Sequence, residues 1–197
     1  LASIQAEAAR ARAQLDVIQQ AEQALAGYSS GAKLLLEAAG QAKLSGVKGA
    51  LIAHLEVSPE LEVAIAAALG EYLNAILLET ENTSVEALDL LTEQPVRAAL
   101  LPLKSLISAK PIQAPQDEAC FGVAADLVQA TPELRPAVDL LLGSVLVVRD
   151  RKAARRLLAS AAPNVRAVTL QGEVFHATGP ILANREGETS LLSRPRQ

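Results

Sequence analysis

The chain has 197 residues and a formal net charge of -4, and 50% of its residues are hydrophobic while only 2% are aromatic. This length suffices for one domain or two small lobes with an aliphatic core, and the acidic balance excludes a globally basic nucleic-acid-binding protein. The single cysteine, Cys120, excludes an intramolecular disulfide and a zinc site made of cysteines alone. No apolar run reaches the ~18 residues that a membrane-spanning helix needs. The sequence contains no methionine, so we expect a fragment of a longer protein.

Residues 1–28 are predicted to form the start of a coiled coil. Apolar residues recur at alternating three- and four-residue steps, interrupted only at Glu22, and they are Leu1, Ile4, Ala8, Ala11, Leu15, Ile18 and Leu25. This spacing is typical of the seam of a heptad repeat. Because alanine weakens the seam, an amphipathic helix packed on its own domain is the alternative. The helix should end near Gly27 and Gly31, which bracket two serines.

Residues 49–70 and 122–143 share one pattern, offset by 73 residues and aligned without a gap. In each copy a glycine precedes a short apolar segment, and an apolar helix then ends at a second glycine, Gly70 or Gly143. Ser58 and Thr131 are the predicted N-caps of these helices, because proline follows each of them at the first helical position. The repeat indicates that the chain contains two copies of one small lobe.

Each copy is followed by a strand, a helix and a second strand, which the sequence predicts at 75–79, 84–93 and 97–103, and at 145–149, 151–160 and 165–170. The predicted fold is therefore mixed α/β, with two duplicated lobes between helices of an antiparallel coiled coil. The expected boundaries are 1–28 for the first coil helix, 29–104 for the first lobe, 105–119 for a proline-containing connector, 120–186 for the second lobe and 187–197 for the returning helix.

This order of segments resembles the hinge domain of SMC proteins, the structural-maintenance-of-chromosomes ATPases, and of their bacterial members in particular. The segment "VRAALLPL" at 96–103 is similar to the family's Gly-Arg-Ala-x-Phe-Leu-Pro-Leu, with Val96 and Leu100 in place of the glycine and the phenylalanine. The segment "VTLQGEV" at 168–174 is similar to Val-Thr-Leu-Asp-Gly-Glu-Val. The segment "SLLSR" at 190–194 resembles the start of the returning coil.

The chain departs from the family in its glycine motif, which is Gly, six residues, Gly, three residues and Gly-Gly. Gly172 and Gly179 are present at the right spacing, but Ala183 and Asn184 replace the last pair. Glycine in a strand allows two backbones to approach closely. The replacement therefore leaves the fold intact and puts the tightness of that contact in question.

The resemblance implies a homodimerisation module that joins two SMC subunits at the far end of their coiled arms, each lobe contacting the opposite lobe of the partner. We expect exposed strand edges to pair. The candidate interface residues are Gly172, Val174, Phe175, Gly179, Ile181, Ala98 and Leu100. For the segment around Ala98 and Leu100, a buried central strand is the alternative.

The resemblance also implies a place in a chromosome-organising, DNA-tethering ATPase complex, cytoplasmic and associated with the nucleoid. ATP binding and accessory condensin-type subunits would belong to head regions absent from this chain. We therefore expect no enzyme activity, cofactor, metal or membrane partner in this fragment.

A weak, electrostatic contact with DNA is expected at one of two basic clusters. The first cluster is Arg149, Arg151, Lys152, Arg155 and Arg156, and the second, at the coil junction, is Lys33, Lys43, Lys48, Arg185 and Arg194. Several cations on one helix face can neutralise phosphates, although a solvated helix face is the alternative. The four aromatic residues supply a poor stacking platform for single strands.

The residues that could perform chemistry form no catalytic constellation. His54 and His176 lack a second metal ligand at helical spacing and are interpreted as core or interface residues, and Cys120 as a small buried hydrophobe. The alternative function is a small-molecule or anion-binding α/β domain that uses the helix starts at Ser58 and Thr131. A zinc-hook coiled-coil ATPase would need a Cys-x-x-Cys motif, which the sequence lacks.

Overall fold

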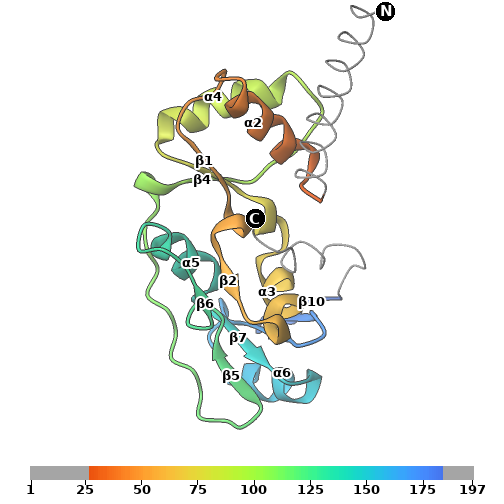
Figure 1. Cartoon of the computed structure of the whole chain (residues 1–197). Helices are drawn as coiled ribbons and strands as arrows, with labels where there is room; N and C mark the ends of the chain where they lie inside the picture. The colour runs from red at the N-terminus through yellow and green to blue at the C-terminus, as the bar shows by residue number, and fades with distance from the viewer. Residues whose placement is uncertain (1–26, 184–197) are drawn as a thin grey trace, which may run out of the picture.

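The computed structural model describes residues 27–183, so the coil helices predicted at 1–28 and 187–197 lie outside the described residues, apart from positions 27 and 28. In Figure 1 the described part forms two lobes. One contains α2, α4, β1 and β4, and the other contains β5, β7, α5 and α6. Each lobe has its own sheet, and buried aliphatic residues of both lobes join in one core.

The first lobe is built on a three-stranded sheet. Its middle strand, β3 (Ile76–Leu78), pairs antiparallel with β1 (Val47–Ala50) and parallel with β4 (Leu100–Pro102). Helices α2 (Ser30–Gly40) and α4 (Glu81–Thr92) lie side by side over this sheet (Figure 1). Helix α2 is not among the predicted elements. Its start is fixed by a short polar cap, because the Ser29 hydroxyl accepts a hydrogen bond from the Ala32 N–H.

The second lobe is built on a five-stranded sheet in the order β10-β9-β8-β7-β5. The strands are β5 (Cys120–Val123), β7 (Val145–Val148), β8 (Arg166–Thr169), β9 (Val174–His176) and β10 (Ile181–Leu182). Only β7 and β8 run parallel, because α6 (Arg151–Leu158) connects them as a crossover. The lobe therefore repeats the β-α-β core of the first one and adds β9 and β10.

The predicted duplication is confirmed. Helices α3 (Glu62–Leu69) and α5 (Arg135–Leu142) occupy positions 73 residues apart, as do β1 and β5. Both of these strands carry an irregularity at a glycine, Gly49 with φ 112° and Gly122 with φ 138°. Because other residues rarely adopt such backbone angles, glycine recurs at this bulge in both copies.

The predicted helix starts at Ser58 and Thr131 are wrong. Residues Pro59–Leu61 form a 3-10 turn, in which the Leu61 N–H donates to the Ser58 carbonyl at 2.9 Å, and no side-chain cap forms at Ser58. In the second copy the Leu134 N–H likewise donates to the Thr131 carbonyl. The φ angle of proline suits such a turn as well as a first helical turn, so both α-helices begin three residues later than predicted.

The two lobes meet through equivalent elements. Strand β2 (Glu56–Val57) pairs with β6 (Val128–Gln129), and Glu56 faces Gln129, which lies 73 residues further along the chain. Helix α3 contacts α5. Contacts between equivalent elements are those of an approximate twofold axis. The connector follows the outside of the second lobe in Figure 1, where the Ile112 N–H donates to the Gly143 carbonyl at 2.8 Å.

Candidate dimer interface

The five-stranded sheet ends at β10 on one side and at β5 on the other, so β9 is not an edge strand. The candidate interface residues from Gly172 to Gly179 therefore do not form the exposed edge expected of them, because β9 lies between β8 and β10. Its residues Val174 and Phe175 are only 3% and 5% exposed. After Gly179 the chain turns back and adds the two residues of β10, which cover that edge. Ile181 and Leu182 are instead 52% and 59% exposed.

The peptide groups of Ile181 face the open side of β10. The His176 N–H donates to the Pro180 carbonyl at 2.9 Å, while Ile181 lies opposite Phe175. In an antiparallel ladder this places Ile181 and Phe175 in a non-hydrogen-bonded pair. The N–H and C=O of Ile181 therefore point away from β9, where a further strand could pair with them.

The first lobe presents a comparable edge at β4, which lies at the end of its sheet and is not a central strand. The Ile76 N–H donates to the Ala99 carbonyl at 2.9 Å. Because peptide groups alternate in direction along a strand, those of Leu100 face the open side. The Leu101 side chain is buried, whereas Leu100, and Ala98 just before the strand, are half-buried.

Gly172 and Gly179 are required by turns. Gly172 has φ 81° and its N–H donates to the Thr169 carbonyl in the turn between β8 and β9. Gly179 has φ 114°, and a Cβ there would meet nothing within 4 Å. The two glycines thus shape the hairpins that place β9 and β10. Ala183 is exposed, and Asn184 lies outside the described residues.

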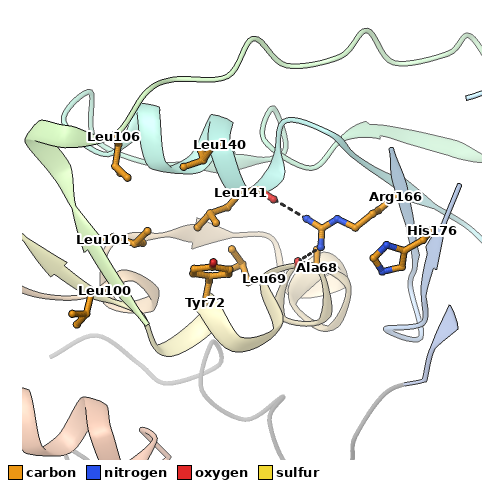
Figure 2. Close-up of a pocket in the computed structure, with 10 residues that line it drawn as sticks. All are labelled: Ala68, Leu69, Tyr72, Leu100, Leu101, Leu106, Leu140, Leu141, Arg166 and His176. Carbon is orange, nitrogen blue, oxygen red and sulfur yellow. Dashed lines mark hydrogen bonds between the residues drawn. The ribbon is translucent and has the colours of Figure 1, made fainter. Parts of the chain in front are cut away.

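A cavity of about 610 Å³ opens between the lobes beside β4 (Figure 2). Its lining is mostly aliphatic, with Tyr72 on one wall and Arg166 and His176 at one end. Burial, together with the charge of Arg166, lowers the pKa of His176, which favours a neutral imidazole at pH 7. Tyr72 and Leu140 are 45% and 42% exposed here, so a partner could cover apolar surface at this position.

Three cations of the first basic cluster already have partners. Arg151 Nε lies 2.7 Å from Glu173 Oε1, and Arg156 Nη2 lies 2.6 Å from Asp117 Oδ2. The hydrogen bond from Arg151 lowers the pKa of Glu173. The pKa of Asp117 is lowered by the Ala119 N–H and then by Arg156. Arg149 donates to the Glu118 carbonyl at 3.1 Å.

Lys152 and Arg155 are exposed on α6 and form no ion pair with any residue of 27–183. In the second basic cluster, Lys48 Nζ lies 3.9 Å from a carboxylate oxygen of Glu133, whereas Lys33 and Lys43 have no such partner in the described part of the chain. Arg185 and Arg194 lie outside it. The two basic clusters thus offer fewer uncompensated charges than their sequences suggest.

The remaining chemical candidates are dispersed. His54 is exposed rather than in the core, with Nε2 3.0 Å from the Lys48 carbonyl oxygen. Cys120 is half-buried, and burial raises the pKa of its thiol. Between residues 27 and 183, no group of three or more His, Cys, Asp or Glu side chains could hold a metal ion. In the same range no helix has the length and apolar character to cross a membrane.

Comparison with known families decides between these interpretations. Residues 44–158 match the family model described as the flexible hinge domain of SMC proteins. This chain belongs to the SMC hinge family. SMC hinges mediate SMC dimerisation in chromosome partition proteins, and the hinge itself is not the ATPase part. The family resemblance stated from the sequence is thereby confirmed.

The relatives of this SMC hinge include full-length chromosome partition proteins. The chain is 30% identical to Chromosome partition protein Smc of Bacillus subtilis over 95% of its length, and 34% identical to that of Myxococcus xanthus over 87%. It spans 16% and 15% of the lengths of these two proteins.

Solved SMC hinges share the fold. An asymmetric dimer of the Geobacillus stearothermophilus SMC hinge domain matches with a TM-score of 0.78 and 29% identity, covering 95% of this chain and 79% of that one. The Pyrococcus furiosus Smc hinge domain with an extended coiled coil matches with a TM-score of 0.65 and 23% identity, over 92% and 63% of the two chains, and supports the fold alone. The predicted mixed α/β class is confirmed.

Proposed function

We propose that this hinge is a homodimerisation module in which β4 of each chain pairs with β10 of its partner chain. The observation that carries the proposal is that an edge strand of each lobe, β4 in one and β10 in the other, directs peptide groups away from its own sheet. A twofold axis then makes the same β4–β10 contact twice and closes the dimer at two junctions. Each junction would join a three-stranded and a five-stranded sheet into one continuous sheet.

The side chains at these edges suit such pairing. Ile181 and Leu182 expose apolar surface on β10, and Tyr72 does so beside β4. Burying such surface contributes about 25 cal/mol per Å², and pairing satisfies the outward peptide groups of Leu100 and Ile181. The interface also depends on the strand next to β10, because β9 and its two turns position β10. The residues that form this strand and its turns include Gly172, Val174, Phe175 and Gly179.

Sedimentation equilibrium of residues 1–197, from nanomolar to tens of micromolar concentration, tests the proposal. We expect a dimer that persists into the nanomolar range, since two junctions must open together for dissociation. A chain that stays monomeric at tens of micromolar would contradict the proposal.

We further propose that this module joins two subunits of a chromosome-organising, DNA-tethering ATPase, in the cytoplasm and at the nucleoid. The support is the likeness to chromosome partition proteins over nearly the whole chain. In this proposal, ATP and accessory condensin-type subunits bind to regions outside the 197 residues.

A weak contact with DNA is a second candidate function, favoured by the two uncompensated cations of α6. Since each neutralised phosphate contributes about 0.9 to the salt dependence of binding, the double variant K152A/R155A should lower that slope by about two. Fluorescence anisotropy with a duplex at several salt concentrations measures it. The matched variant K33A/K43A removes equal charge from the first lobe. If K33A/K43A lowers the slope and K152A/R155A does not, the contact is not on α6.

A further inference from the structure

Arg166 connects the two copies of the duplicated lobe at equivalent atoms. From β8, its Nη1 donates to the Ala68 carbonyl at 3.2 Å and its Nη2 to the Leu141 carbonyl at 3.0 Å (Figure 2). Ala68 lies in α3 and Leu141 in α5, and the two residues are 73 positions apart. One guanidinium group therefore bonds the same position in both copies and lies close to the approximate twofold axis.

The two helix ends act as the counter-charge of this guanidinium. Carbonyl groups in the last turn of a helix have no partner within it, and each helix C-terminus carries about half a negative charge. Arg166 is partly buried, burial lowers its pKa, and it forms no ion pair with a carboxylate in the described range. Two helix ends supply about one unit of negative charge, which offsets the desolvation of the arginine.

The first lobe has no such residue at the equivalent position. In the first copy the Leu51 N–H donates to the Ala75 carbonyl, and in the second the equivalent Ala124 N–H donates to the Val145 carbonyl. These two bonds make Ala75 equivalent to Val145 and so align β3 with β7. With this alignment, the strand registers place Ala99 at the position of Arg166. Helix α3 packs directly against β8, whereas α5 and β4 line the 610 Å³ cavity. Arg166 thus adds one central link to the β2–β6 pairing and the α3–α5 contact that already join the lobes.

Arg166 also lies on a chain of contacts that connects β10 with β4. It pairs with His176 of β9, and β9 carries β10. On the other side, the Ala68 carbonyl belongs to the helix that leads into β3, the neighbour of β4. A rotation of one lobe against the other would change the distance between β4 and β10, and it would have to break the bonds of Arg166.

We infer that Arg166 is a positioning residue that fixes the angle between the lobes, so that β4 and β10 are spaced for a dimer closed at both junctions. The inference rests on the proposed dimer. Without Arg166 each lobe keeps its own sheet and the β2–β6 pairing remains, but the angle between the lobes varies and the dimer joins at one junction at a time. A second junction acts as an intramolecular contact, and its loss should weaken dimerisation about 100-fold.

The test measures the distance between the lobes separately from dimerisation. Spin labels at Glu86 and Ser160, exposed residues of different lobes, are introduced in a C120A background for pulsed electron resonance. We expect a narrow distance distribution in the parent and a broad one in R166Q, with a dissociation constant about 100-fold higher by sedimentation. R149Q is the matched control. Arg149 also donates to a backbone carbonyl, that of Glu118, but this bond does not connect the two lobes.

The outcomes separate the inference from the proposed function. A narrow distribution and unchanged dimerisation in folded R166Q overturn the inference. A parent chain that does not dimerise contradicts the proposed function. In that case a broad distance distribution in R166Q would still support Arg166 as a link between the lobes. If R166Q fails to fold, R166K decides. The lysine ammonium is a single donor group and cannot reach both carbonyls as the guanidinium does, so we expect a distance distribution of intermediate width. A distribution as narrow as that of the parent overturns the inference.

Discussion

The I181P variant should be monomeric at concentrations where the parent hinge is a dimer. Proline removes the N–H that Ile181 directs to the open side of β10. The bond from His176 to Pro180 does not involve this N–H, so the fold within the chain should keep its thermal midpoint within a few degrees. The substitution acts twice in a twofold dimer, once at each junction.

The expected loss for I181P is large because each junction loses a hydrogen bond and leaves an acceptor unpaired. At about 2 kcal/mol per junction, the two together raise the dissociation constant about 1000-fold. Sedimentation equilibrium measures the constant. I181V keeps the N–H and a β-branched side chain, and should dimerise within about threefold of the parent. If I181P also stays within that range, β10 is not a pairing edge.

The G31A variant should destabilise the first lobe by about 3 kcal/mol, through overpacking against backbone. Gly31 is buried in α2, and a Cβ there would overlap the Arg97 carbonyl oxygen and lie 3.0 Å from the Ala98 Cβ. The backbone cannot move aside as a flexible side chain can. Since residues 97 and 98 lead directly into β4, the dimer should weaken together with the fold.

Urea denaturation of G31A, with G40A as its control, measures this effect. Gly40 ends the same helix, and a Cβ there would meet nothing within 4 Å. Because alanine favours a helix more than glycine does, G40A should be stabilised by up to about 1 kcal/mol. Equal midpoints for the two variants would show that α2 does not pack closely on the segment before β4.

The duplicated core was predictable because its signals are local. Gly49 and Gly122 lie at the bulges, Gly70 and Gly143 follow the helices, and aliphatic runs mark β3 and β7. These features recur at fixed spacing, so one copy supports the interpretation of the other. The helix starts were misplaced because a proline after a serine or threonine suits a 3-10 turn as well as an α-helix.

The edges and the lobe junction were not predictable in the same way. Strand β10 has only two residues after Pro180, too few to show an alternating pattern. Arg166 bonds the carbonyl of Ala68, 98 residues earlier in the chain, and a backbone acceptor leaves no mark in the side-chain sequence. The carboxylates that pair with Arg151 and Arg156 likewise come from distant segments. The sequence of α6 alone therefore suggests more unpaired positive charge than the folded chain presents.

The place of Arg166 has a consequence for how such a molecule could arise. If two identical, separate chains formed the two lobes, any residue near their shared axis would occur twice. Two guanidinium groups would then compete for the same two helix ends and repel each other. Joining the copies into one polypeptide lets one copy keep arginine while the other has Ala99 at the matching position. Gene fusion therefore makes available a central contact that exact symmetry forbids.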